Sequence, residues 1–200
     1  REMTVPSRGT GVSSVVFADD DALLAVGYSS GQVWLLHSSC DAKEPLELPG
    51  RDSPVLSLAI SPTCLQVATG CADGTANIWC TRTGLSLQTL DCHGATVWSL
   101  AFSPDGAALA VGVGNGTALI FNVQHGAQRR PHVLICEGRW LNSVSFSPDG
   151  VLAATGDDDG SVGLWSAGTG WRRRTLRAPL APGSQRAVLA LAFLPAMCCA

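Results

Sequence analysis

The chain has 200 residues, of which 46% are hydrophobic and only 14% charged, a balance that permits a buried core and excludes a disordered chain. Its net charge of −3 excludes strong attraction to nucleic acid through overall charge. No apolar signal region opens the sequence, and the longest apolar stretch, residues 188–200, is too short to span a bilayer. We therefore expect no membrane partner.

The eight cysteines form no C-x-x-C pair and no cysteine–histidine set with zinc spacing. An even count also permits the disulfide framework of a secreted protein, but a chain this long and apolar can fold without one. We expect reduced thiols and a cytoplasmic or nuclear location.

Five apolar segments of six residues recur along the chain, and their last residues are 43, 42, 44 and 47 positions apart. Two series of glycines follow them, each with spacings of 43, 42 and 44. Three landmarks that keep one period indicate a repeat architecture. The segments are Val12–Phe17, Val55–Ile60, Val97–Phe102, Leu141–Phe146 and Val188–Phe193, and the glycines are Gly27, Gly70, Gly112 and Gly156, then Gly31, Gly74, Gly116 and Gly160.

Each unit predicts four strands in the same order. The apolar segment is the first strand, and a turn such as Ser103–Gly106 follows, with proline second and glycine fourth as a type I turn prefers. A small-residue strand such as residues 108–113 comes next, and a tight hairpin that ends in glycine leads to an apolar third strand such as residues 117–121. A looser fourth strand, such as residues 132–135, precedes the next unit.

The third strands are apolar at nearly every position, so both of their faces must be covered by neighbours. One unit cannot cover both faces of its own sheet. Stacking the units around an axis does so, and this arrangement is a β-propeller.

The motifs F-S-P-D-G and A-T-G-x-x-D-G and the closing Ile78-Trp79 resemble the WD-repeat (WD40) family, from about Val12 to Pro195. The resemblance implies an all-β propeller with four-stranded antiparallel blades. We expect repeats at residues 12–50, 51–93, 94–137 and 138–183, a partial repeat at 184–200, and a linker or preceding outer strand at 1–11.

Four repeats and the start of a fifth predict an incomplete arc, a fragment of a larger, seven-bladed ring, because such a ring needs about 300 residues at this period. Further blades of the same chain would then cover the open faces and strand edges. A closed four-bladed ring is the alternative, but it leaves no place for the fifth first strand.

The three aspartates Asp157, Asp158 and Asp159 fall on the hairpin between the second and third strands of the fourth repeat. A calcium loop would need a bidentate carboxylate further along, and residues 161–167 contain none. We therefore expect a structural turn and no metal site.

In the WD-repeat family, the aspartate before the hairpin glycine joins a histidine, a serine or threonine and a tryptophan in a buried network that locks the blade. The resemblance implies this role for seven residues, and no repeat has a complete set. Glu137 stands at the histidine position of the fourth repeat, where it is a poor substitute beside an aspartate, so we expect lower stability than in a regular propeller. The seven residues are Asp73, Thr69 and Trp79, then Asp159, Thr155 and Trp165, and His93.

No serine lies in a nucleophile elbow, and no glycine-rich phosphate loop precedes a helix. His125, His132 and Cys136 could be metal ligands only by bridging a loop and a fourth strand. We therefore expect no enzymatic activity and no cofactor.

Basic residues recur at equivalent places after the third strands of the last two repeats. Together with a tryptophan they predict a basic rim that could hold phosphates and stack bases of RNA. The alternative is a solvated outer strand whose charges protect its edge. The rim consists of Arg129, Arg130, Trp171, Arg172, Arg173, Arg174 and Arg177.

Propellers of this family act mostly as rigid scaffolds, and partners dock on their loop faces. The resemblance therefore implies a non-catalytic protein-interaction scaffold that mediates assembly of a multiprotein complex, with other proteins as partners. RNA binding through the basic rim is the alternative function.

Overall fold

The computed structural model describes residues 11–18, 23–37, 44–50, 52–124, 130–138, 140–177 and 187–193. Within these ranges no helix is long and apolar enough to cross a membrane. The regular elements are sixteen strands: β1 (Val12–Phe17), β2 (Leu23–Tyr28), β3 (Val33–His37), β4 (Leu46–Leu48), β5 (Val55–Ile60), β6 (Gln66–Cys71), β7 (Thr75–Cys80), β8 (Ser86–Asp91), β9 (Val97–Phe102), β10 (Ala108–Val113), β11 (Thr117–Asn122), β12 (His132–Ile135), β13 (Leu141–Phe146), β14 (Leu152–Asp157), β15 (Ser161–Ser166) and β16 (Arg172–Arg177).

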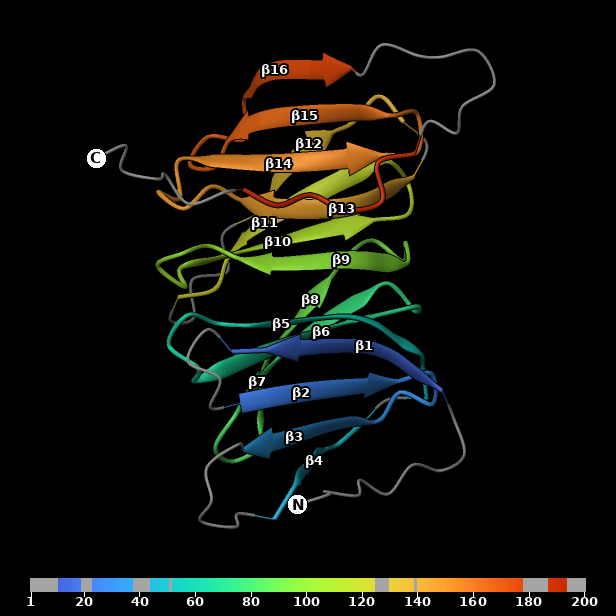
Figure 1. The fold of residues 1–200 in the computed structure, drawn as a ribbon, viewed down its shortest axis with the longest axis vertical. Helices are drawn as coiled ribbons and strands as arrows, with labels where there is room; N and C mark the ends of the chain where they lie inside the picture. Colours follow the sequence, from blue (N-terminus) through green and yellow to red (C-terminus); the bar gives the residue numbers. More distant parts are fainter. Residues whose placement is uncertain are drawn as a thin grey trace, which may run out of the picture.

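The strands form four antiparallel sheets of four consecutive strands each, which we call the first to fourth blades. Consecutive blades meet along their first strands, since β1 lies beside β5, β5 beside β9 and β9 beside β13. The predicted WD40-type propeller with four-stranded blades is confirmed. The first and fourth blades lie at opposite ends of the stack (Figure 1), so the arc is open and a closed four-bladed ring is ruled out.

The turn between the first two strands of the third blade explains why its sequence motif recurs. The Ser103 hydroxyl donates to the Asp105 carboxylate at 2.6 Å and accepts the Ala108 amide at 2.8 Å. The Ser103 hydrogen bond also lowers the pKa of Asp105. Gly106 takes a left-handed φ of 69°, which favours glycine. The turn at 147–150 repeats these contacts.

The first glycine series marks where consecutive blades approach closely. A Cβ at Gly27 would stand 2.9 Å from Val55 Cγ1 and 3.3 Å from Leu58 Cδ1, so only glycine leaves room for the next blade. Buried apolar clusters fill the spaces on either side of these contacts. The same arrangement recurs with Val97 and Leu100 against Gly70, and with Leu141 and Val144 against Gly112.

Residues 187–193 take the place of a fifth first strand beside β13 (Figure 1). Val188 and Leu191 pack against Gly156 as their counterparts do in the earlier blades. The Val188 amide donates to the Asp157 carbonyl at 2.8 Å, and the Leu191 amide to the Ser143 hydroxyl at 3.0 Å. This segment therefore packs on β13 and β14 in the way that the first strand of each later blade packs on the blade before it.

We predict that Gly70→Ala destabilises the chain by about 1–3 kcal/mol, because the new Cβ would overlap the stiff, fully buried Val97. Urea unfolding of both proteins measures the difference. Gly168→Ala is the control, since nothing lies within 4 Å of its Cβ, and it should change stability by no more than about 0.5 kcal/mol. Equal effects of the two substitutions would contradict the close approach of the blades.

Candidate functional site

Two buried hydrogen bonds join the second and third strands within single blades. Trp79 Nε1 donates to Thr69 Oγ1 at 3.0 Å in the second blade, and Trp165 Nε1 to Thr155 Oγ1 at 2.9 Å in the fourth. These are the threonine–tryptophan pairs that the resemblance implies. The third blade has the buried apolar residues Val111 and Phe121 at the equivalent positions. That the polar pairs lock their blades remains a prediction.

The aspartates before the hairpin glycines lie outside these buried pairs, contrary to what the resemblance implies. Asp73 is exposed and accepts from the Thr75 amide at 2.9 Å and its hydroxyl at 2.7 Å, so its carboxylate closes its own turn. Asp159 is also exposed. His93 is exposed at a left-handed φ of 59°, and its amide donates to Asp91. Each of the three residues belongs to a tight turn, and the conformation of that turn places its side chain at the surface.

The buried carboxylate of the fourth blade is Asp157, which the sequence reasoning missed. It is only 3% exposed. Its Oδ1 accepts from the Ser161 amide at 2.8 Å and the Asp159 amide at 3.2 Å, and its Oδ2 from the Gly138 amide at 3.1 Å. Strand alternation could have found it, because Asp157 shares a face with Thr155. The triple aspartate therefore builds a turn and anchors the segment that enters β13.

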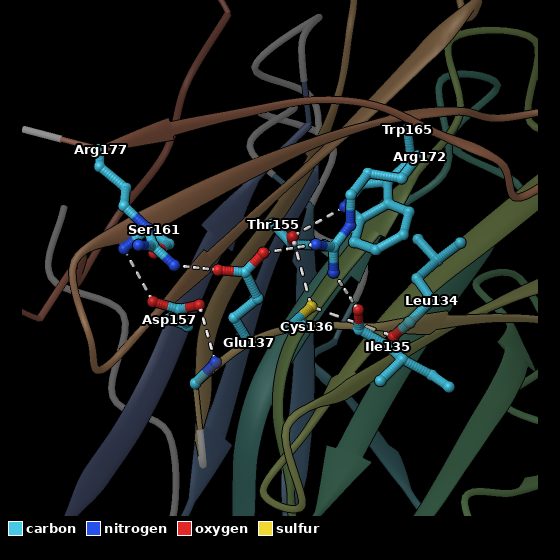
Figure 2. A network of polar contacts seen from close by, with 11 residues as sticks. Leu134, Ile135, Cys136, Glu137, Thr155, Asp157, Ser161, Trp165, Arg172 and Arg177 are labelled. Atoms are coloured by element: carbon cyan, nitrogen blue, oxygen red, sulfur yellow. Dashed lines mark hydrogen bonds and ion pairs between the residues drawn. The ribbon is translucent and has the colours of Figure 1, made fainter.

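Glu137 joins the third and fourth blades at their outer strands (Figure 2). Its Oε1 pairs with Arg172 at 2.7 Å and its Oε2 pairs with Arg177. Hydrogen bonding from Arg177 is the main cause that lowers the pKa of Glu137. Arg172 also donates to the Ile135 carbonyl and lies 4.6 Å from the centre of the Trp165 ring. We call Glu137, Arg172 and Arg177 the inter-blade clamp.

The clamp changes the predicted basic rim. Arg172 and Arg177 are paired with Glu137, which balances part of the positive charge of the rim, although both residues remain exposed. The expected nearness of the two basic clusters agrees with the structure, because a Cβ at Gly170 would stand 2.9 Å from His132 Cβ on β12. Arg129 lies outside the described residues. The other members of the rim are all exposed, and whether they bind RNA stays a prediction: Arg130, Trp171, Arg172, Arg173, Arg174 and Arg177.

A small cavity lies beside the clamp and is lined by Cys136, Thr155, Asp157 and other polar residues. Its volume is about 10 Å³, room for about one water molecule and far below the roughly 300 Å³ at which small-molecule sites begin. The Cys136 thiol donates to Thr155 Oγ1 at 3.4 Å, and burial raises its pKa to about 11. A thiol that stays protonated at neutral pH is a poor nucleophile, so the role of Cys136 in this cavity is structural.

Two exposed tryptophans mark one end of the third and fourth blades. Trp98 on β9 is 43% exposed, and Trp140, directly before β13, is 57% exposed. Both tryptophans lie at the same end of their blades. The Gly114 amide donates a hydrogen bond to the carbonyl of Thr96, two residues before Trp98, and the Asp158 amide donates the equivalent bond to the carbonyl of Trp140. We call Trp98 and Trp140 the tryptophan pair. The sequence did not single them out, because neither tryptophan is one of the residues that recur with the repeat.

The tryptophan pair is held by the hairpins beneath it. A Cβ at Gly114 would stand 2.9 Å from Trp98 Nε1, so this indole rests on hairpin backbone. The Trp140 amide donates to Asp158 Oδ1 at 3.0 Å. Exposed aromatic rings on a fixed backbone lose little conformational entropy on binding, which suits them to contact another macromolecule.

We predict that Thr155→Val destabilises the chain by about 1–3 kcal/mol, because it leaves the buried Trp165 indole without an acceptor. Adding Trp165→Phe should recover part of the loss, because it recreates the Val111 and Phe121 pair of the third blade. Urea unfolding of the single and double variants measures both. Strictly additive losses would show that the hydrogen bond is not the cause.

We predict that the stabilising effect of Glu137 depends on pH. Its pKa in the folded protein lies below the ordinary 4.5, so the clamp contributes above that pH and is lost as pH falls through the folded value. Thermal melts should therefore separate wild type from Glu137→Gln at pH 7 and bring them together in acid. A difference that persists below the folded pKa would contradict this account.

Known proteins share this architecture. A family model described as "WD domain, G-beta repeat" matches residues 43–80, 84–122 and 130–166. No curated protein matches the chain. A chain from the solved structure "Crystal Structure of Mitotic Checkpoint Complex" is 25% identical to the present chain, with a TM-score of 0.81. The match covers 95% of the present chain but only 58% of the solved chain. The family matches cover more than half of the sequence, and this chain therefore belongs to the WD40 repeat family.

Proposed function

We propose that this chain is a non-catalytic protein-interaction scaffold, a propeller segment of a larger protein that assembles a multiprotein complex. The tryptophan pair is the observation that carries the proposal. Tryptophan is enriched among the residues that dominate protein–protein binding energy, and here two lie exposed at one end of adjacent blades.

The stacked sheets support a scaffold because they hold the pair in a fixed arrangement. Trp98 lies on β9 and Trp140 directly precedes β13. These two inner strands lie side by side, and the Val144 amide donates a hydrogen bond to the Ser99 hydroxyl at 3.1 Å. The solved chain described above comes from the structure of a complex, which agrees with a role in assembly. WD40 propellers generally bind other proteins rather than catalyse reactions.

We predict that replacing the tryptophan pair abolishes partner binding. Trp98→Ala and Trp140→Ala should each weaken the affinity for a bound protein by at least about tenfold, the cost of losing a strong interface contact. Mass spectrometry of proteins retained from cell extract identifies the partner, and calorimetry then measures its affinity for each variant.

Trp171→Ala is the matched control, because Trp171 is exposed but lies beyond the opposite end of β15, in the hairpin before β16. This variant should retain the same proteins as wild type. The scaffold proposal fails if no protein partner is retained, or if all three variants lose the partner equally.

RNA binding remains the second candidate, and the exposed Arg173 and Arg174 beside Trp171 are the observation in its favour. Filter binding of single-stranded RNA at physiological salt tests it. Arg173→Glu should reduce binding, because a phosphate contact would be replaced by repulsion. Unchanged binding, or none in the wild type, would remove this candidate.

A further inference from the structure

The hairpin between β10 and β11 of the third blade contains an asparagine followed directly by a glycine. Of the four asparagines in the sequence, only Asn115 has glycine as its next residue. Asn115 is exposed. Because glycine carries no side chain, it leaves its own backbone nitrogen open to the side chain of the residue before it. This pair therefore has the composition that favours attack of a backbone nitrogen on a side-chain amide.

The amide of Gly116 has no hydrogen-bond acceptor in the part of the chain that the structure describes. At the equivalent glycines of the other blades, the amide donates to the carbonyl three residues before it, at 3.0 Å for Gly31, 3.3 Å for Gly74 and 3.4 Å for Gly160. Gly116 is buried, and a buried amide without an acceptor is unfavourable in free energy. A bond from the Gly116 nitrogen to carbon would remove this unpaired donor.

The side-chain carbonyl of Asn115 is bound by two donors. Asn115 Oδ1 accepts from the Thr117 hydroxyl at 2.6 Å and from the Thr117 amide at 3.2 Å. Both donors lie where negative charge develops on the oxygen when a nucleophile adds to Cγ, and donors in that position accelerate the addition. The hairpin thus combines an activated carbonyl with an unpaired amide nitrogen on the next residue.

Asn122, at the end of β11, provides a comparison within the same blade. It is exposed, and its Oδ1 also accepts from the amide two residues further on, that of Gln124, at 3.1 Å. The amide of the next residue, Val123, donates to the Ala107 carbonyl at 2.9 Å, and the branched Val123 side chain is buried. The nitrogen that would attack Cγ is therefore hydrogen-bonded after Asn122 and unpaired after Asn115.

The second blade shows that this hairpin accommodates an aspartate at the same place. Asp73 is the equivalent of Asn115, and its carboxylate accepts from the Thr75 amide at 2.9 Å and from the Thr75 hydroxyl at 2.7 Å. An ionised carboxylate accepts hydrogen bonds more strongly than an amide oxygen does. Conversion of the Asn115 amide to a carboxylate should therefore preserve the turn.

We propose that Asn115 is a site of spontaneous deamidation, in which the Gly116 nitrogen attacks Asn115 Cγ while the Thr117 hydroxyl stabilises the charge on Oδ1. Solvent base removes the proton of the Gly116 amide, and a bond forms between its nitrogen and Cγ. The bond from Cγ to Nδ2 breaks, and Nδ2 leaves as ammonia after taking a proton from water. Water then opens the cyclic imide. Cleavage of the bond between the Gly116 nitrogen and Cγ gives aspartate, and cleavage at the backbone carbonyl gives isoaspartate.

The site does not depend on the scaffold function, but its consequence for binding does. Asn115 adjoins Gly114, and the Trp98 indole rests on the backbone there. Deamidation adds a negative charge at this hairpin, and isoaspartate also lengthens the backbone by a methylene group. The modification therefore alters the surface beside the tryptophan pair.

Incubation of the whole purified chain in water enriched in heavy oxygen, at neutral and at mildly alkaline pH, tests the proposal. Mass spectrometry of peptides follows conversion at each asparagine, and the heavy oxygen marks the carboxylates that form during incubation. We expect Asn115 to convert at least about tenfold faster than Asn122, a modest difference in activation barrier. Conversion should also be faster at the higher pH. Equal rates at the two residues, or an Asn115 that remains an amide, would overturn the proposal.

Thr117→Val is the matched variant, because it keeps the branched shape of the side chain and removes the hydroxyl. It should slow conversion of Asn115 severalfold, less than the roughly hundredfold that a donor in an enclosed site contributes. In urea the two proteins should convert at the same rate, since the unfolded chain holds no hydroxyl beside Oδ1. Unchanged or faster conversion of the folded variant would show that Thr117 restrains Asn115 and would contradict the proposed step.

Asn115→Asp supplies the aspartate product directly. Its melting temperature should equal or exceed that of wild type, because the new carboxylate can take the contacts that Asp73 makes in the second blade. A lower melting temperature would show that the hairpin does not accommodate the product. These readouts are the same whether or not the chain binds a protein partner, so they can fail independently of the scaffold proposal.

Discussion

The contact between a glycine on the second strand of one blade and apolar side chains on the first strand of the next governs this structure. Hydrogen bonds hold the four strands of a blade together, but they cover neither face of the sheet. The faces are buried only by neighbouring blades, and a Cβ at Gly70 or Gly112 would prevent that approach. The stability of each blade therefore depends on its neighbours, as in other repeat proteins.

The features that repeat could be predicted from the sequence, because their regular spacing reveals them without any knowledge of which distant residues are in contact. The glycine spacing and the Ser103–Gly106 turn predicted four-stranded blades and their order, and both agree with the structure. The threonine–tryptophan hydrogen bonds were also placed correctly, since Thr155 and Trp165 are separated by a single hairpin.

The features that break the repeat could not be predicted in this way. Glu137 meets Arg172 across 35 sequence positions, and no periodic pattern relates an outer strand to the loop of the preceding blade. For the same reason the sequence could not show that Arg172 and Arg177 of the basic rim pair with a carboxylate. Asp157 was overlooked because the resemblance directed attention to Asp159, although only the former points into the blade.

The inter-blade clamp has a mechanical consequence. Consecutive blades touch mainly along their inner strands. A force that separates the outer strands of two blades therefore rotates the blades about this inner contact. Glu137 follows the outer strand β12, and Arg172 and Arg177 lie on the outer strand β16. There the lever arm is longest, so a modest attraction resists the greatest torque. Along the part of the chain that the structure describes, ion pairs occur only at this junction, so the last two blades should move as one stiff element while the others flex more freely.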